Sequence, residues 1–214
     1  ISFARGNLRS VSDRTRLIFT GGYTSGPAVV YNTLEFVTIA STGDTADFGD
    51  LTQARSRHSG FSSSTRGFAA GGMSSPSPTT PSEVIDFVII QSTGNAVDFG
   101  DMTSARFGNR GAQSPTRGMI FGGKDSSETR NIIEFVTMST TGNATDFGDL
   151  SSDMHQGTAG SNAVRAIAGA GTVNNSGTAT TGMLFVTIAS LGNAQDFGEL
   201  AQNHIECGEG ACSP

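Results

Sequence analysis

The side chains most able to do chemistry in this sequence are acidic residues that recur with a fixed spacing. Asp44, Asp47 and Asp50 form one such group, and similar strings return three more times along the chain. Clustered carboxylates suit a hard cation such as calcium. The spacing does not match an EF-hand loop, however, and Asp and Asn are ordinary residues at turns. Calcium is therefore the less favoured alternative, and we expect no metal and no cofactor.

The tripeptide Asp-Phe-Gly within these strings also binds magnesium in protein kinases, which contain it once. Here it occurs four times, without the glycine-rich loop, strand lysine and catalytic-loop Asp that kinases need. A motif that returns in every copy of a repeat favours a structural role.

Other groups that could catalyse a reaction show no arrangement for it. The tyrosines are Tyr23 and Tyr31, the histidines are His58, His155 and His204, and neither type is repeated or clustered. No Ser-His-Asp pattern and no pair of carboxylates for acid–base work is visible. We expect a non-catalytic protein, with a composite site built from distant loops as the alternative.

Composition excludes several classes of function. The formal net charge is -6, so no basic surface is available to collect the phosphates of a nucleic acid. The most apolar stretch, residues 84–90, contains Asp86 and is far shorter than the ~20 residues of a membrane-spanning helix. Near the C-terminus, Cys207 and Cys212 would need a turn between them to form a disulfide, so two free thiols are expected.

Four internal repeats organise the chain. Their aromatic anchors, 51, 48 and 50 residues apart, are Phe48, Phe99, Phe147 and Phe197. A period near 50 residues is typical of a propeller or solenoid. The predicted units are residues 1–50, 51–101, 102–149 and 150–199. Because residues 200–214 match the opening of a unit, we expect a fifth repeat to begin there, and the natural protein to continue or another chain to supply the missing strands.

Each unit is predicted to contain four strands, so the fold class is all-β. In the second unit they cover about residues 57–63, 67–71, 84–92 and 96–102. No segment has a sustained helical period, and the third strand is apolar on both faces, as expected of a sheet covered on both sides. Gly43, Gly94 and Gly142 are expected to supply the positive φ of the turn before the fourth strand.

These features together resemble the kelch repeat of β-propellers. The resemblance rests on an Arg after a hydrophobic-Thr step (Leu51-Thr52-Gln53-Ala54-Arg55), a strand ending in Gly-Gly, a Glu-Phe-Val strand and an aromatic before the last strand. It implies a propeller of four-stranded blades, in which the phenylalanine anchors occupy the place of the family's Trp. The copper held by Tyr and His in oxidases of this fold finds no counterpart here.

More narrowly, the Phe-Val-Thr strand followed by Thr-Gly-Asn and Asp-Phe-Gly-Asp is similar to kelch-like proteins of tailed phages of marine cyanobacteria. That resemblance implies a virion or tail-appendage protein, located in the virion or outside the cell and part of an oligomeric assembly. Its partners would be other appendage subunits and a host-surface glycan or receptor. The alternative is a secreted or cell-surface propeller that acts as a structural protein-interaction module.

All variation in unit length falls in one loop, between the second and third strands. The span from the second Gly of each pair to the next Phe is 14, 15, 12 and 14 residues. Variable loops on a constant scaffold are the usual place for recognition, although they also vary where nothing constrains them. With the links between units, they would carry the predicted binding residues Tyr23, Tyr31, Arg55, Arg106 and Lys124.

The opposite turns are predicted to carry ion pairs. One set of turns carries Arg16, Arg66, Arg117 and Arg165, and the other leads to Asp47, Asp98, Asp146 and Asp196. We expect these residues to pair within or between blades and to bond turn carbonyls, which would fix register more than stability.

Overall fold

The computed structural model describes residues 2–76, 79–175 and 177–204. Within these ranges every regular element is a β-strand, and the fold class is all-β as predicted. Cys207 and Cys212, and most of the expected fifth repeat, lie outside the described residues.

Four antiparallel sheets of four strands follow one another along the chain, each with its strands in sequence order. Sheet 1 contains β1 (Arg9–Ser12), β2 (Arg16–Thr20), β5 (Thr33–Thr38) and β6 (Ala46–Asp50). Sheet 2 contains β7 (Ser59–Ser62), β8 (Arg66–Ala70), β11 (Val84–Ile89) and β12 (Val97–Asp101). Sheet 3 contains β13 (Arg110–Gln113), β14 (Arg117–Phe121), β15 (Ile132–Thr137) and β16 (Thr145–Asp149). Sheet 4 contains β17 (Thr158–Ser161), β18 (Arg165–Gly169), β21 (Gly182–Thr187) and β22 (Gln195–Glu199).

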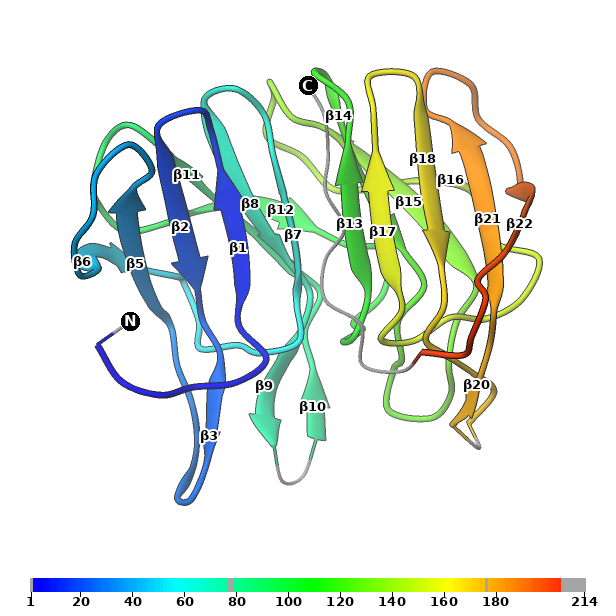
Figure 1. The fold of residues 1–214 in the computed structure, drawn as a ribbon, viewed down its shortest axis with the longest axis horizontal. Coiled ribbons are helices and arrows are strands. Elements are labelled where there is room, and N and C mark those ends of the chain that lie inside the picture. Colours follow the sequence, from blue (N-terminus) through cyan, green and yellow to red (C-terminus); the bar gives the residue numbers. More distant parts are fainter. Residues whose placement is uncertain (1, 77–78, 176, 205–214) are drawn as a thin grey trace.

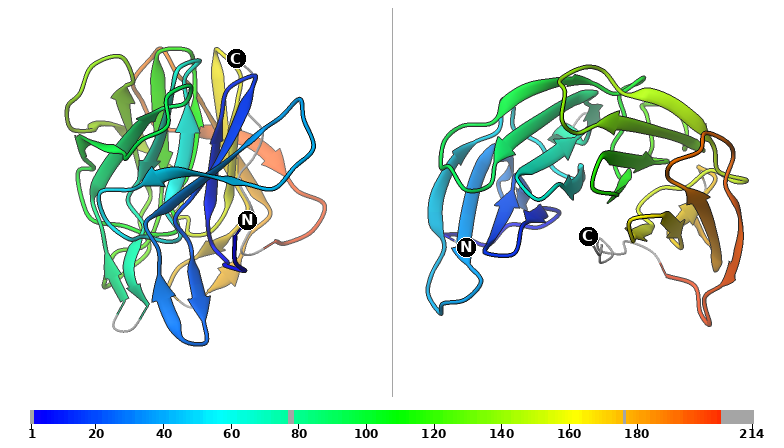
Figure 2. Two further views of the ribbon diagram at one scale, coloured as in Figure 1. Left: turned by 90° about the vertical axis from the view of Figure 1, so that its left-hand side faces the viewer. Right: turned by 90° about the horizontal axis from the view of Figure 1, so that it is seen from above.

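The sheets stand side by side (Figure 1) and form an open arc (Figure 2). Seen from above, the first strand of each sheet lies on the inside of the arc and the fourth strand on the outside (Figure 2). The first strands contact one another in the order β1, β7, β13 and β17. Sheets 1 and 4 are therefore the two ends of the arc, and among the described residues each has a neighbouring sheet on one side only.

The apolar core lies between the sheets. One cluster joins sheets 1 and 2, where Ile18, Leu34 and Phe48 pack with Val88 and neighbouring residues. Similar clusters join sheets 2 and 3 and sheets 3 and 4. The third strands of sheets 2 and 3 are therefore covered on both faces, as predicted, whereas those of sheets 1 and 4 are covered by described residues on one face only.

The sheets approach so closely that large side chains are excluded from one sheet wherever the other supplies one. A Cβ atom on Gly67 of sheet 2 would overlap the side chain of Val11 in sheet 1. In the same way, a Cβ on Gly118 of sheet 3 would overlap the ring of Phe61 in sheet 2. Small residues on these strands are therefore required by packing between sheets.

The turn before each fourth strand reaches back to the preceding sheet. The side-chain oxygen of Asn95 accepts a hydrogen bond from the backbone N–H of Asp50 at 3.1 Å, and Gly94 N–H donates to the carbonyl of Phe48 at 2.7 Å. Asn143 and Asn193 repeat this contact at 3.0 Å. We call it the Asn latch.

Two of the three predicted turn glycines have a positive φ. Gly94 and Gly142 each have φ 153°, whereas Gly43 is outside the positive region, which corrects that part of the prediction. Gly94 and Gly142 pack against the fourth strand of the preceding sheet, at Gly49 and Gly100. The turn at Gly43 has no described sheet in front of it, so nothing imposes this conformation there.

The predicted ion pairs of the turn arginines are wrong, although their bonds to carbonyls are correct. Each guanidinium lies over the Phe of its own third strand, as Arg66 does over Phe87 at 4.8 Å. Three of the four also donate to a carbonyl of the following sheet: Arg16 to Ile90, Arg66 to Met138 and Arg117 to Ile188, at 3.1, 2.9 and 2.7 Å. Among the described residues no ion pair joins Arg16, Arg66, Arg117 or Arg165 to Asp47, Asp98, Asp146 or Asp196, which are all exposed.

Three of the four phenylalanine anchors are buried between sheets. Phe48, Phe99 and Phe147 are 2%, 3% and 3% exposed, whereas Phe197, at the open end of the arc, is 48% exposed. We expect Phe99→Ala to lower the free energy of unfolding by about 3 to 5 kcal/mol because it leaves a cavity. Phe197→Ala is the matched control and should cost much less. Chemical denaturation of both variants measures the difference, and equal losses would contradict the packing described.

Candidate functional site

The loops that vary in length all emerge on one face, as predicted. Three are two-stranded ribbons: β3 (Tyr23–Ser25) with β4 (Ala28–Val30), β9 (Met73–Pro76) with β10 (Thr79–Pro81), and β19 (Thr172–Val173) with β20 (Thr178–Ala179). They point the same way, below the sheets in Figure 1. The fourth and shortest loop, residues 124–129, is closed by a single bridge between Lys124 and Thr129. We call these four segments the ribbon face.

Each ribbon is anchored at its base by the pair of small residues that precedes it. Gly72 has φ 103°, and a Cβ there would lie 2.8 Å from the carbonyl oxygen of Ser56. The next residue, Met73, exchanges two backbone hydrogen bonds with Ser56, at 2.8 and 3.0 Å. Gly72 N–H also donates to the carbonyl of Arg106 in the link to the following sheet, at 2.8 Å. The bases of the ribbons are thus fixed, and length can vary toward the tips.

Three of the five predicted binding residues lie on this face. Tyr23 and Tyr31 are half-buried at the first ribbon, where the Tyr31 ring packs against Phe3 with centroids 4.6 Å apart. Lys124 is half-buried at the start of the shortest loop. Tyrosine offers flat aromatic surface with a hydroxyl, and lysine offers an ammonium group, so each can contact a polar partner.

The other two predicted binding residues, Arg55 and Arg106, are not on the surface. Both are 0% exposed, and each forms an ion pair inside its own sheet, with Asp86 and Glu134 respectively. The prediction that they contact a partner is therefore wrong. They follow the links between sheets, as expected, but their side chains turn inward beneath the ribbons.

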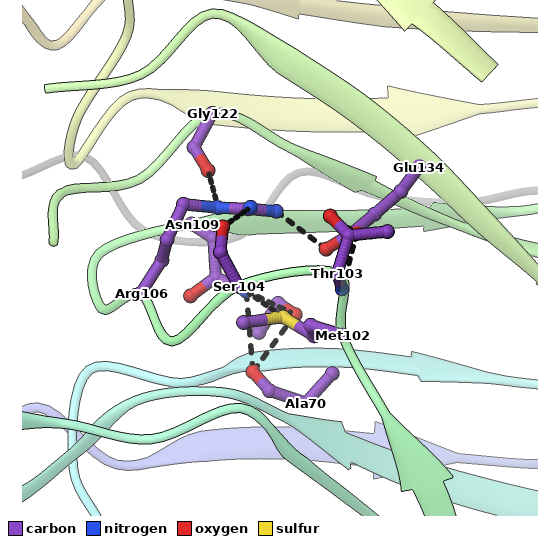
Figure 3. Close-up of polar contacts among 9 residues, drawn as sticks. Ala70, Met102, Thr103, Ser104, Arg106, Asn109, Gly122 and Glu134 are labelled. Carbon is purple, nitrogen blue, oxygen red and sulfur yellow. Dashed lines mark hydrogen bonds and ion pairs between the residues drawn. The ribbon is translucent and has the colours of Figure 1, made fainter. Parts of the chain in front are cut away.

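The pair in sheet 3 shows how completely these groups are bonded (Figure 3). Arg106 bonds Glu134, donates through Nε to the carbonyl of Gly122 at 2.9 Å, and donates to the Ser104 hydroxyl at 2.6 Å. Thr103 donates to Glu134 from both its N–H and its hydroxyl, at 2.9 and 2.6 Å. The cluster is therefore structural, and it ties the link to the third strand.

Burial opposes the charges of the equivalent pair in sheet 2. It lowers the pKa of Arg55 and raises the pKa of Asp86, in spite of the 2.8 Å contact between them. Removing both side chains from water costs several kcal/mol per ion, which their attraction repays only in part. The pair therefore specifies a position more than it adds stability.

Sheet 4 replaces this pair with two apolar residues. Met154 stands where units 1 to 3 have Arg5, Arg55 and Arg106, and Leu184 stands where they have Glu35, Asp86 and Glu134. Met154 is 5% exposed in the cluster between sheets 3 and 4, and Leu184 packs against the same cluster. The joint replacement is visible in the sequence, and it would have identified the partners of Arg55 and Arg106.

This exchange predicts the outcome of a double substitution in sheet 2. Arg55→Met alone should lower the free energy of unfolding by about 3 to 5 kcal/mol, because it leaves Asp86 buried without its partner. Adding Asp86→Leu should restore most of the loss, as in sheet 4. Urea denaturation of the single and double variants checks this, and a double variant less stable than Arg55→Met would contradict it.

Two buried histidines lie beneath the ribbons. His58 is 0% exposed, with Nε2 2.7 Å from the Thr20 hydroxyl, and burial lowers its pKa well below the usual value. His155 is 9% exposed and makes an edge contact with the Phe107 ring. Burial, assisted by the charges of Arg110, Lys124 and Arg57, lowers the pKa of His155 to about 4. Both are held neutral by the fold.

These histidines predict a loss of stability in mild acid. An unfolded histidine has a pKa near ~6.5, so below that pH the unfolded chain binds protons that the folded chain excludes. The contribution of His155 is complete above about pH 6.5 and is lost toward its folded pKa of about 4. We expect the free energy of unfolding to fall by about 3 kcal/mol for His155 in this window. Denaturation at several pH values measures it, and an equally steep loss in His155→Gln would contradict the assignment.

Neither a cluster of metal-binding side chains nor a membrane-spanning helix is found in the part of the chain that the structure describes. No three or more His, Cys, Asp or Glu side chains there are placed to hold a metal ion. No described helix is long and apolar enough to cross a membrane.

Comparison with known proteins supports the fold. No protein-family model matches the chain, and no curated protein sequence is similar to it. Among solved structures, the chain is similar to one titled "Structure of YjhT", with a TM-score of 0.79 and 11% sequence identity. The likeness covers 97% of this chain and 74% of that chain. At this identity it supports the propeller-like arrangement of antiparallel sheets and carries no statement about activity.

Proposed function

We propose that the chain is a kelch-like β-propeller scaffold that binds a partner through its ribbon face and catalyses no reaction. The observation that supports this is the contrast between the two parts of each unit. The repeated residues are used in packing and bonding between sheets, whereas the ribbons vary in length and sequence on fixed bases. A rigid base that presents variable segments is suited to recognition.

The buried polar groups support the non-catalytic part of the proposal. Arg55 and Arg106 form buried ion pairs with Asp86 and Glu134, and His58 lies beneath the surface with its ring hydrogen-bonded to Thr20. The exposed aspartates Asp47, Asp98 and Asp146 lie on the fourth strands, opposite acids that are already bonded to the buried arginines: Glu35, Asp86 and Glu134. None of these groups is both accessible and paired with a second group for proton transfer.

The proposed partner is a component of a host surface, such as a glycan or receptor, contacted by a virion or appendage protein outside the cell. Support for this setting comes from the sequence resemblance described above and from the chemistry of Tyr23, Tyr31 and Lys124. The second candidate is a structural module whose ribbons bury against neighbouring subunits over about 1,200 Å² or more. The small supply of aromatic residues on the ribbon face favours that candidate.

Binding measurements with matched variants separate the two functions. The isolated protein should bind a glycan array or host cells, and Tyr23→Ala and Lys124→Ala should weaken binding at least severalfold without lowering the melting temperature. Asp47→Ala, which changes an exposed residue of β6 outside the ribbon face, is the control. Absence of binding, with the ribbons buried in an assembled particle, would contradict recognition and support the structural role.

A further inference from the structure

The outer face of sheet 4 has the features that each earlier sheet uses to hold its successor. Phe197 corresponds to Phe48, Phe99 and Phe147, but it is 48% exposed. With Ile167 and Met183 it lines an open hollow of about 580 Å³. Arg165 also lines this hollow and lies over Phe185 at 4.9 Å. No described residue supplies the carbonyl that Arg16, Arg66 and Arg117 each find in the next sheet.

The backbone of this face is shaped for the same contact. Gly148 of sheet 3 has φ 146°, and a Cβ there would lie 2.6 Å from the carbonyl of Gly192 in the turn of sheet 4. Gly198 holds the equivalent position with φ 134°, yet nothing lies within 4 Å of its Cβ position. The backbone of sheet 4 at Gly198 therefore has the conformation that Gly148 has beneath an Asn latch, but no described turn contacts it.

At the other end of the arc, the outer face of sheet 1 also exposes apolar side chains. Ile39 is equivalent to Ile90, Met138 and Ile188, whose carbonyls accept the arginines, and its side chain is 55% exposed. Leu17, Phe19 and Val37 lie on the same face and are half-buried. Asp44 replaces the latch asparagine, and its carboxylate oxygen can accept the same backbone N–H.

The two faces complement each other in size. At two junctions a residue of the first strand faces a residue of the next sheet's second strand: Val11 faces Gly67 and Phe61 faces Gly118. At the third junction the residues at these positions are Ala112 and Ala166, which share one core cluster. One member at least is always small. The unmatched members at the two ends are Gly160 and Leu17, again one small and one large. Within one molecule they cannot meet, because the ends of the arc are apart (Figure 2).

We propose that sheet 4 of one molecule docks against sheet 1 of a second copy, head to tail. Leu17 would fill the space left by Gly160, Arg165 would donate to the carbonyl of Ile39, and Asp44 would accept from the N–H of Glu199. The contact continues the packing already seen at three junctions. Because it joins two different faces, it leads to a ring or an open filament rather than a symmetric dimer.

In this junction the segment before sheet 1 of one copy and the segment after sheet 4 of the other would occupy the same position. Residues 2–5 and 201–204 are equivalent, so one segment has to leave. Residues 2–5 are firmly held, since Ser2 N–H and the Arg5 guanidinium bond Glu35 at 2.9 and 2.7 Å. Residues 201–204 are exposed, and the carbonyl of His204 accepts one bond, from Gly171. Residues 201–204 are therefore the segment that we expect to be displaced when the two copies dock.

Complementation between two variants tests the proposal. Phe197→Asp places a charge on the apolar docking face of sheet 4, and Ile39→Asp does the same on sheet 1. By sedimentation velocity, the wild-type protein should form larger species as concentration rises, while each variant should remain a single chain. An equal mixture of the variants should form dimers and nothing larger, because one intact face of each kind remains. Val97→Asp, at a residue 56% exposed on sheet 2, is the control and should behave as wild type.

Folding of every variant is checked by circular dichroism and melting. Truncation after Leu200 supplies an independent test, since it removes residues 201–204 together with the rest of the C-terminus and should leave association unchanged or strengthen it. A wild-type protein that stays a single chain at all concentrations would overturn the proposal. Two folded variants that fail to pair when mixed, or an association lost on truncation, would overturn it as well.

Discussion

Close packing between neighbouring sheets is the constraint on which the rest of the structure depends. Each sheet is narrow, and its third strand is apolar on both faces, so a single sheet has no core of its own. Stability arises only where two sheets meet, around a phenylalanine from one and small or branched residues from the next. The high glycine content follows from this geometry, because residues such as Gly67 stand where any side chain would overlap the neighbouring sheet.

The polar residues that repeat serve the same junctions. The turn arginines stack on one sheet and bond the next, and the latch asparagines bond the sheet before them. The buried arginine–acid pairs hold the link between sheets to the third strand. In sheet 4 the apolar residues Met154 and Leu184 fill this position, which agrees with the small net gain expected of a buried ion pair. The repeat therefore requires two buried side chains that fill this space, and either an ion pair or two apolar residues can do so.

Local signals in the sequence are sufficient to predict the period, the four strands of each unit and the face that varies. Glycine turns and alternating burial act over a few residues, and for this reason the predicted strand of residues 84–92 agrees closely with β11. Contacts between distant segments were harder to predict. Asp47 is a predicted partner of Arg16 in the same unit, but the guanidinium donates instead to the carbonyl of Ile90 in the next sheet. The interior location of Arg55 depends on Asp86, 31 residues away, which strand periodicity does not reveal.

If stability lies between the sheets, the sheets should unfold together while the ribbons open independently. Amide hydrogen exchange followed by mass spectrometry distinguishes this from separate unfolding of each sheet, by comparing the N–H groups that cross between sheets, such as those of Gly94, Gly142 and Gly192, with those inside a sheet. We expect both sets to exchange together, in one global unfolding step, and the ribbon β3–β4 to exchange much faster. Exchange of the crossing amides well before those within each sheet would show that the sheets are stable separately and that the junctions do not hold the fold together.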